Sequence, residues 1–272
     1  MRRLLAVLLL AGCMVGGVFA DPVQPGFFYD QNAQASYDPL GLQLVSQVYY
    51  RIPLFRMPGI LWESTRIDVG IQNNLSPSYE MIGPAITIEP IAFLDLTFTA
   101  QLIGYYSELS FGFYTLPDYS AGYDSPSLAP LTPKDTTGYL LTASPTLKFA
   151  LGPVAALDKF QVSYFNVDGG SSFFYERINN TVLGKSDTEL VNQAYLLYSV
   201  APGTRVGLND ALLYVPSSGY VSHRLSAMGV YSGNLSDALT LYGALFLGTF
   251  LTDRYYQWSV YVAGQVGITL KL

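Results

Sequence analysis

The sequence predicts an all-β fold, an antiparallel up-and-down β-barrel that crosses a membrane. The chain is unusually apolar, with 50% hydrophobic and only 12% charged residues among its 272, against about 25% charged residues in ordinary globular domains. Beyond residue 20 there is no run of eighteen uncharged apolar residues, so no membrane-spanning helix is predicted. Many segments instead alternate apolar and polar residues, the period of a β-strand. A closed barrel is the remaining way to satisfy backbone hydrogen bonds in lipid.

The first twenty residues have the layout of a secretory signal peptide, with a basic start at residues 1–3 followed by an apolar stretch. Two processing sites compete. We favour cleavage after Ala20, whereas the segment that ends at Cys13 matches a lipoprotein box and would be lipidated there. The mature chain is therefore expected to be exported, and Cys13, the single cysteine, cannot form an intramolecular disulfide.

The net charge of the chain limits the classes of partner that it can bind. Without residues 1–20 the sequence has 14 − 2 = 12 basic and 20 acidic residues, a formal charge of 12 − 20 = −8. An acidic surface argues against nucleic acid as a partner. Aromatic residues make up 14% of the chain and include 22 tyrosines, which fits the aromatic girdles of membrane barrels.

The clearest strand is the last one, where apolar residues occupy alternate positions from Tyr256 to Leu272. About nine to eleven residues suffice for a tilted strand to cross a bilayer. An apolar strand at the chain terminus resembles the closing strand of bacterial outer-membrane β-barrels, although Leu272 stands where those proteins usually carry an aromatic residue. The resemblance implies a location in the bacterial outer membrane. It also implies two partners, outer-membrane lipid and the barrel-assembly machinery, which reads the C-terminal strand.

Alternation predicts eleven strands directly, at about residues 42–52, 65–75, 79–89, 94–102, 138–151, 157–167, 189–200, 203–215, 222–232, 238–250 and 256–272. Bacterial single-chain barrels have an even number of strands. We therefore predict twelve, with the missing strand within residues 22–38, and keep ten as the alternative. Residues 21–40 would be an N-terminal periplasmic extension with one short strand, and residues 41–272 the barrel domain.

Two long connections, residues 107–137 and 168–188, interrupt the alternation. Outer-membrane barrels keep long loops outside and short turns in the periplasm, so both are predicted to be extracellular. The first carries Tyr114, Tyr119 and Tyr123, which would form the working surface of a surface-binding barrel. Its acids, Asp118, Asp124 and Asp135, lack the close alternate spacing of a calcium loop. We interpret them as a solvated acidic loop and predict no metal site and no cofactor.

Polar residues with inward parity are predicted to line the lumen: Arg51, Arg66, Asp68, Asp95, Gln101, Lys148, Gln161, Gln257 and Gln265. Barrels of about eight strands are filled by side chains and those of sixteen leave an aqueous channel, so twelve lies between. Two interpretations stay open. The groups form a satisfied network that plugs the barrel, or a constriction that selects small polar solutes by charge and width.

His223 is the single histidine of the sequence. The order His-x-x-Ser that it begins differs from the His-x-Ser followed by Asn-Gly of outer-membrane phospholipases. His223 also shares the apolar parity of Leu225, so we interpret it as an interface histidine. Asp210 has the parity of apolar neighbours as well, where acids are disfavoured. Either a bulge at Asn209 and Asp210 turns the acid inward or it sits at a rim, and we favour the bulge.

These patterns predict a channel or uptake pore for small polar solutes. The alternative is a non-conducting structural or surface-binding barrel with a plugged lumen. A hydrolase at the barrel rim is a third interpretation, but it needs a nucleophile and a base that the sequence does not supply, so we expect no enzyme.

Overall fold

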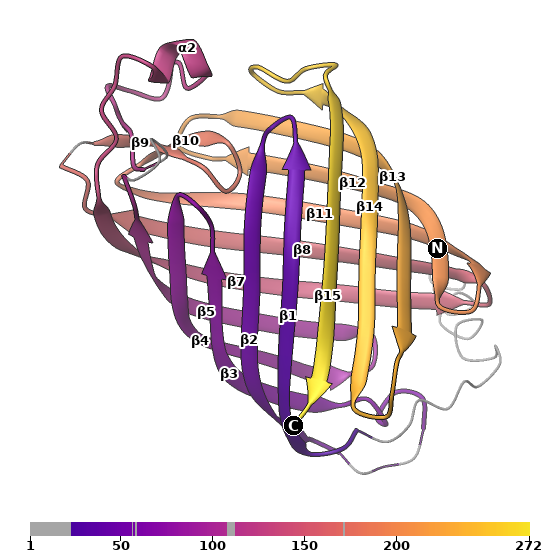
Figure 1. The fold of residues 1–272 in the computed structure, drawn as a ribbon. Coiled ribbons are helices and arrows are strands. Elements are labelled where there is room, and N and C mark those ends of the chain that lie inside the picture. Colours follow the sequence, from indigo (N-terminus) through magenta and orange to yellow (C-terminus); the bar gives the residue numbers. More distant parts are fainter. Residues whose placement is uncertain (1–22, 56, 58, 108–111, 171) are drawn as a thin grey trace, which may run out of the picture.

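The computed structural model describes residues 23–55, 57, 59–107, 112–170 and 172–272. Twelve antiparallel strands form a closed barrel, which confirms the predicted fold class and strand number (Figure 1). Consecutive barrel strands pair along the chain, and β1 pairs with β15 to close the sheet. The barrel strands are β1 (Gly26–Tyr37), β2 (Gly41–Pro53), β3 (Arg66–Leu75), β4 (Tyr79–Ile91), β5 (Leu94–Tyr105), β7 (Thr136–Leu151), β8 (Val154–Val167), β11 (Ser186–Ala201), β12 (Thr204–Val215), β13 (Tyr220–Asn234), β14 (Leu239–Thr252) and β15 (Val260–Lys271).

The first strand shows that the N-terminal region belongs to the barrel. β1 is twelve residues long and pairs with β15 from Phe28↔Lys271 to Tyr37↔Val262. It is therefore a full closing strand and not the short strand of an extension. The signal peptide and the two processing sites, at Ala20 and Cys13, lie outside the described residues.

The last strand is shorter than its alternation predicts, because β15 begins only at Val260. Although the sequence alternates here, local hydrogen bonds form a turn instead of a strand. The Asp253 carboxylate accepts hydrogen bonds from the backbone N–H groups of Tyr255 and Tyr256 at 2.9 and 3.1 Å. Trp258 then has a positive φ of 65°, which interrupts an extended backbone. Residues 253–259 are therefore a connection, not part of a strand.

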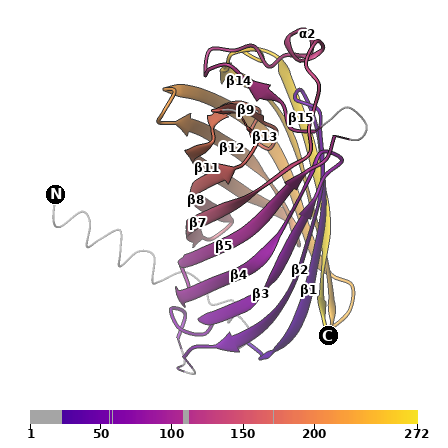
Figure 2. The same ribbon diagram turned by 90° about the vertical axis from the view of Figure 1, so that its left-hand side faces the viewer.

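The two ends of the barrel differ. The C-terminus lies at one end, here called the C-terminal end, and helix α2 (Ser125–Leu128) lies beyond the opposite end, which carries the two longest connections (Figures 1 and 2). Exposed aromatic residues gather at both. At the C-terminal end they are Phe27, Tyr50, Phe93, Phe149, Tyr198 and Tyr231, and at the opposite end Tyr37, Tyr139, Tyr214 and Trp258.

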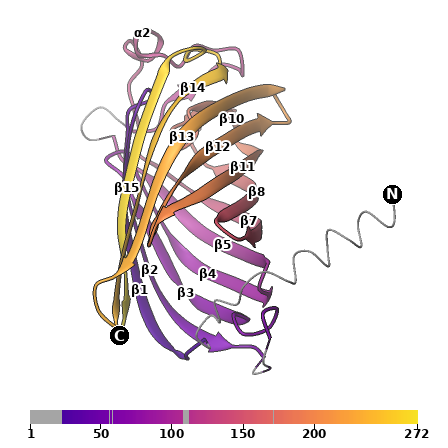
Figure 3. The same cartoon turned by 90° about the vertical axis from the view of Figure 1, so that its right-hand side faces the viewer.

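A second, three-stranded sheet fills the end opposite the C-terminus. It consists of β6 (Thr115–Leu116), β9 (Phe173–Glu176) and β10 (Thr181–Gly184), in the order β10-β9-β6, and is here called the plug. Figures 1 and 3 show it at the mouth of the barrel. Both predicted long loops thus fold into one sheet. Phe174 and Leu183 of the plug pack with inward barrel residues in one buried cluster: Tyr79, Met81, Ile103, Tyr105, Leu140, Phe165, Val167 and Val215.

Within the described ranges, no helix combines the length and the apolar character that a membrane span requires.

Candidate functional site

An ion-pair network lies inside the barrel near the C-terminal end. Arg51 forms two parallel hydrogen bonds with Asp68, from Nε to Oδ1 at 2.8 Å and from Nη2 to Oδ2 at 2.9 Å. Arg66 Nε also binds Asp68 Oδ2, at 3.1 Å. The Asp68 side chain is only 8% exposed, and such bidentate pairing compensates the loss of its hydration.

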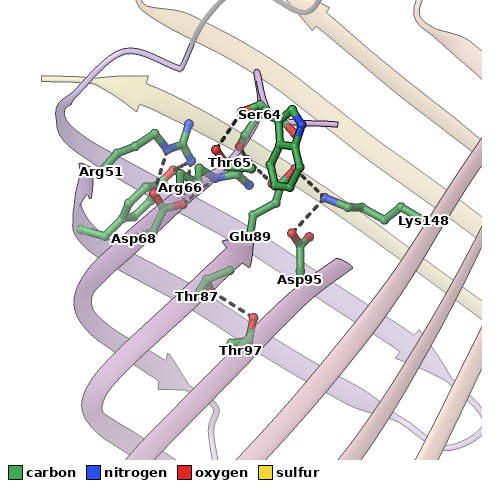
Figure 4. A network of polar contacts seen from close by, with 12 residues as sticks. Arg51, Ser64, Thr65, Arg66, Asp68, Thr87, Glu89, Asp95, Thr97 and Lys148 are labelled. Carbon is green, nitrogen blue, oxygen red and sulfur yellow. Dashed lines mark hydrogen bonds and ion pairs between the residues drawn. The ribbon is translucent and has the colours of Figure 1, made fainter. Parts of the chain in front are cut away.

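The same network continues across β4, β5 and β7. Arg66 also pairs with Glu89, and Lys148 Nζ reaches Glu89 Oε1 at 3.3 Å and Asp95 Oδ1 at 2.9 Å (Figure 4). The structure thus joins five of the predicted lumen residues in one network. Glu89 completes it and was missed by our sequence prediction, although its parity, opposite to the outward Ile88, indicated an inward position.

A cavity of about 910 Å³ lies between this network and the plug, and residues of the β1–β2 and β3–β4 turns also line it. Gln101, Gln161 and Gln265, three predicted lumen residues, are among its lining side chains. Hydroxyl groups of Thr99, Ser144 and others add donors and acceptors. The described lining contains no Asp or Glu, so the cavity can offer hydrogen bonds without negative charge.

The remaining predicted lumen residue, Gln257, is misplaced by the sequence prediction. It lies in the exposed connection between β14 and β15, where its Nε2 donates to Leu251 O at 3.3 Å. The prediction placed it inward because it extended the terminal strand four residues too far, from Val260 back to Tyr256.

Three basic residues line the cavity, and none of them was predicted. Lys159 shares the inward parity of Gln161, and Arg224 alternates with the outward His223 and Leu225, so parity could have found both. Arg177 comes from the plug, where no period exists. Its Nε donates to Gly112 O at 3.2 Å and its guanidinium lies 5.1 Å from the ring centre of Tyr175.

A buried carboxyl pair joins the plug to the barrel wall. Glu176 of β9 and Glu189 of β11 are both fully buried. Glu176 accepts backbone hydrogen bonds from Ile178 and Asn179 at 2.6 and 2.7 Å, and Asn179 Nδ2 donates to Glu189 Oε2 at 2.8 Å. Burial raises the pKa of Glu176 to about 7, although these hydrogen bonds lower it. The plug is therefore docked through a group that titrates near neutrality.

The loop tyrosines are not an exposed surface. Tyr114 and Tyr123 are buried in a second cluster of the plug, against which Tyr119 packs. Tyr119 OH also donates to Asp187 Oδ2 at 2.9 Å. These side chains hold the plug together, because the loop folds back into the barrel mouth.

The three acids of the same loop have different surroundings. Asp118 accepts hydrogen bonds from the backbone and hydroxyl of Ser120, and Asp135 accepts one from Ser107 N at 2.6 Å. Asp124 is the N-cap residue of α2. In the part of the chain that the structure describes, no cluster of three or more His, Cys, Asp or Glu residues could hold a metal.

The predicted bulge at Asn209 and Asp210 is wrong. The β12–β13 register is unbroken through both residues, so Asn209 points inward, at 2% exposure, and Asp210 outward. His223 of the neighbouring strand compensates the outward acid: its Nε2 lies 3.0 Å from Asp210 Oδ2. Because Ser222 and Ser226 are buried on the opposite face, His223 has no adjacent nucleophile on its strand.

No protein-family model matches the sequence, and no curated protein does either. Solved structures match its fold. The transport unit of the autotransporter AIDA-I from Escherichia coli covers 98% of this chain and 97% of its own at 10% identity, with a TM-score of 0.51. The NanC porin covers 90% of this chain and 100% of its own at 9% identity, with a TM-score of 0.44. The translocator domain of the autotransporter NalP from Neisseria meningitidis covers 100% and 94% at 11% identity, with a TM-score of 0.42.

The fold is thus that of a bacterial outer-membrane β-barrel, as in the AIDA-I transport unit. At these identities the likeness extends to the fold alone.

Proposed function

We propose that this chain is an outer-membrane channel through which a small polar solute passes. The observation that carries the proposal is the cavity of about 910 Å³ inside a closed barrel. Its lining of amides, hydroxyls and cations can replace the hydration shell of a polar solute. Small polar molecules fit, since pockets for drug-sized ligands usually measure about 300–1,000 Å³.

The barrel surface supports a place in the outer membrane. Its outward side chains are apolar, and exposed aromatic residues mark both ends, as in the girdles at the two interfaces of membrane barrels. Outer-membrane lipid is then the partner of the apolar belt. We propose that an N-terminal signal directs export and that the assembly machinery reads β15.

The C-terminal end is proposed to face the periplasm and the plug the outside, because the two longest connections lie at the plug end. Four of the five connections at the C-terminal end have two to four residues, and the fifth, residues 54–65, is longer. An epitope inserted after Ala129, an exposed residue beside α2, should be labelled on intact cells. One inserted after Ser236, in the β13–β14 turn, should not. The opposite labelling would reverse the orientation.

Conductance of the purified barrel in planar bilayers tests the channel itself. The plug covers one mouth, so we expect small conductance steps that grow when residues 173–184, the β9–β10 hairpin, are replaced by a short Gly-Ser linker. A barrel that stays silent in both forms would not be a channel.

The buried core of the plug favours a second function. Phe113 and Phe174 stack at 5.0 Å between ring centres, in contact with Tyr105, and such dry packing suits a permanently closed, structural barrel. The hairpin replacement separates the two: a closed barrel would lose stability without gaining conductance.

A further inference from the structure

We propose that the cavity binds a small organic anion that carries several hydroxyl groups. The inference rests on the proposed function for the route by which the ligand arrives, but the binding itself does not require passage. It comes from the charges of the cavity lining and from the donors that have no acceptor.

Arg224 is held in place without being neutralised. Its guanidinium lies 3.8 Å from the ring centre of Tyr261 and 5.7 Å from that of Phe250. Aromatic faces attract a cation and orient it, but they leave its charge in place. Its Nε is buried without a hydrogen-bond partner, and among the described residues no acid forms an ion pair with it. Arg224 as a whole is half-buried, and a cation that is partly removed from water is stabilised by an anionic partner.

Lys159 lies in the same row of the wall. The registers Lys159↔Gln193, Gln193↔Ala211 and Ala211↔Arg224 connect the two cations across β8, β11, β12 and β13. At about 4.8 Å per strand, their backbones are about 14 Å apart along the wall. Lys159 is half-buried as well. Within the described chain it forms no hydrogen bond or ion pair.

Hydrogen-bonding side chains surround the two cations. Gln193 stands between them in the row, and Tyr195 and Asn209 come from the adjacent inward positions; all three line the cavity. Gln101 of β5, two strands from β8, is 3% exposed and its Nε2 has no acceptor. Tyr195 OH already donates to Gln193 Oε1 at 2.8 Å and Asn209 Nδ2 to Ala194 O at 3.3 Å, so the donors without an acceptor are Gln101 Nε2 and Arg224 Nε. Two such donors and two cations fit a ligand rich in oxygen, with one carboxylate or phosphate and several hydroxyls.

The plug adds the third cation of the lining, Arg177. Asp253 lines an adjoining small cavity of about 100 Å³, which Arg224 and Gln193 also line. It accepts hydrogen bonds from Tyr220 OH and Ser222 Oγ, both at 2.8 Å. The negative charge of Asp253 is thus already engaged by donors, and the main cavity stays positive.

Calorimetric titration of the refolded barrel with four probes tests the proposal. Gluconate carries a carboxylate and hydroxyls, glucose 6-phosphate a phosphate and hydroxyls, glucose only the hydroxyls, and acetate only the charge. We expect the two hydroxylated anions to bind at least about tenfold more tightly than glucose or acetate, because only they combine a charge for the cations with hydroxyls for the amides. A preference between gluconate and glucose 6-phosphate identifies the anionic group. Equal binding of glucose and gluconate would overturn the proposal.

Substitutions locate the binding. Lys159→Gln and Arg224→Gln should each weaken the binding of gluconate about tenfold or more, and Lys159→Arg should restore it. Lys185→Gln is the matched control, because it removes one positive charge from an exposed pair with Asp168. Heat-resistant mobility on gels verifies folding of each variant. Unchanged binding in both cavity variants would refute the site, whereas binding without conductance would refute only the channel.

Discussion

The lumen contains two sets of charges with opposite organisation. At the C-terminal end, Arg51, Arg66 and Lys148 are all paired with acids, whose side chains are 2–20% exposed. In the cavity, Lys159 and Arg224 have amide and hydroxyl groups as neighbours, and among the described residues neither forms an ion pair with an acid. The first set satisfies itself and joins strands β2, β3, β4, β5 and β7. The second is satisfied only by water or by a ligand.

This difference distinguishes the charges that stabilise the barrel wall from those that could bind a ligand. The residue types alone do not distinguish them, because both sets contain Arg and Lys. A paired network contributes rigidity, and removing one partner leaves another charge buried. Unpaired cations contribute little to the fold but attract an anion into a confined, polar space. The loop between β2 and β3 adds to this rigidity at the C-terminal end. Its Leu61 O accepts a hydrogen bond from Ala92 N at 3.1 Å.

The largest effect is expected from Lys148→Glu. The new carboxylate would lie beside Glu89 and Asp95, and losing one partner of a buried pair costs about 3–5 kcal/mol. The folded, heat-resistant band on gels should melt at a clearly lower temperature than that of the native protein. The control is Lys185→Glu, which breaks a pair whose side chains are 50% and 80% exposed, so its cost should stay within about 1 kcal/mol. A stable, conducting Lys148→Glu barrel with altered ion selectivity would instead make this end a hydrated constriction.

The next largest effect concerns the plug. Phe174→Ala removes a ring that stacks on Phe113 at 5.0 Å, and such truncations cost about 3–5 kcal/mol. Because the barrel hydrogen bonds are untouched, the loss should fall on plug docking: conductance should rise while the barrel melts as before. Phe149→Ala, the same change at a 59% exposed outward position, should leave conductance unchanged. Equal conductance of the native and Phe174→Ala proteins would show that the plug does not close the lumen.

The sequence predicts a feature of this molecule well where local contacts determine the structure, and poorly where distant contacts do. Alternation predicted the strands correctly. It also predicted that the side chains of Gln101 and Lys148 point inward, because successive side chains of a strand point to opposite faces of the sheet. It failed at Gln257, where backbone hydrogen bonds to Asp253 make a turn out of an alternating segment. It also failed at Asp210, whose compensating partner, His223, lies thirteen residues away on the next strand.

The plug could not be predicted at all. Its strands have only two to four residues, too few to show a period, and they come from two loops about sixty residues apart. The tyrosines that look like an exposed surface in the sequence are therefore its core. Lys159 and Arg224 had the correct parity, but whether an acid of the described chain pairs with them depends on the closed barrel.

A smaller effect is expected from pH. The pKa of Glu176 is about 7 in the docked plug against an ordinary value of 4.5, so the docked state keeps a proton that an undocked plug loses. Docking should therefore be strongest below about pH 4.5 and weaken up to about pH 7, by at most about 1.4 kcal/mol per pH unit. Glu189 faces the same carboxyl and Arg177 follows it in sequence. Conductance should rise between pH 5 and pH 8, and Glu176→Gln should flatten the rise. An equally steep profile in that variant would assign the titration to another group.

The smallest effect is expected outside the lumen, where Asp210 and His223 form a pair within the apolar belt. Their side chains are 46% and 31% exposed, and exposed pairs contribute about 0–1 kcal/mol. Asp210→Ala should thus destabilise the barrel only slightly in detergent. In lipid vesicles the paired substitution to leucine at both positions should be neutral or stabilising, because polar groups on a lipid-facing surface are costly. A double-mutant cycle in urea, run in both environments, measures the coupling. A large loss of stability from the leucine pair in vesicles would mean that this outer face binds a polar partner in place of lipid.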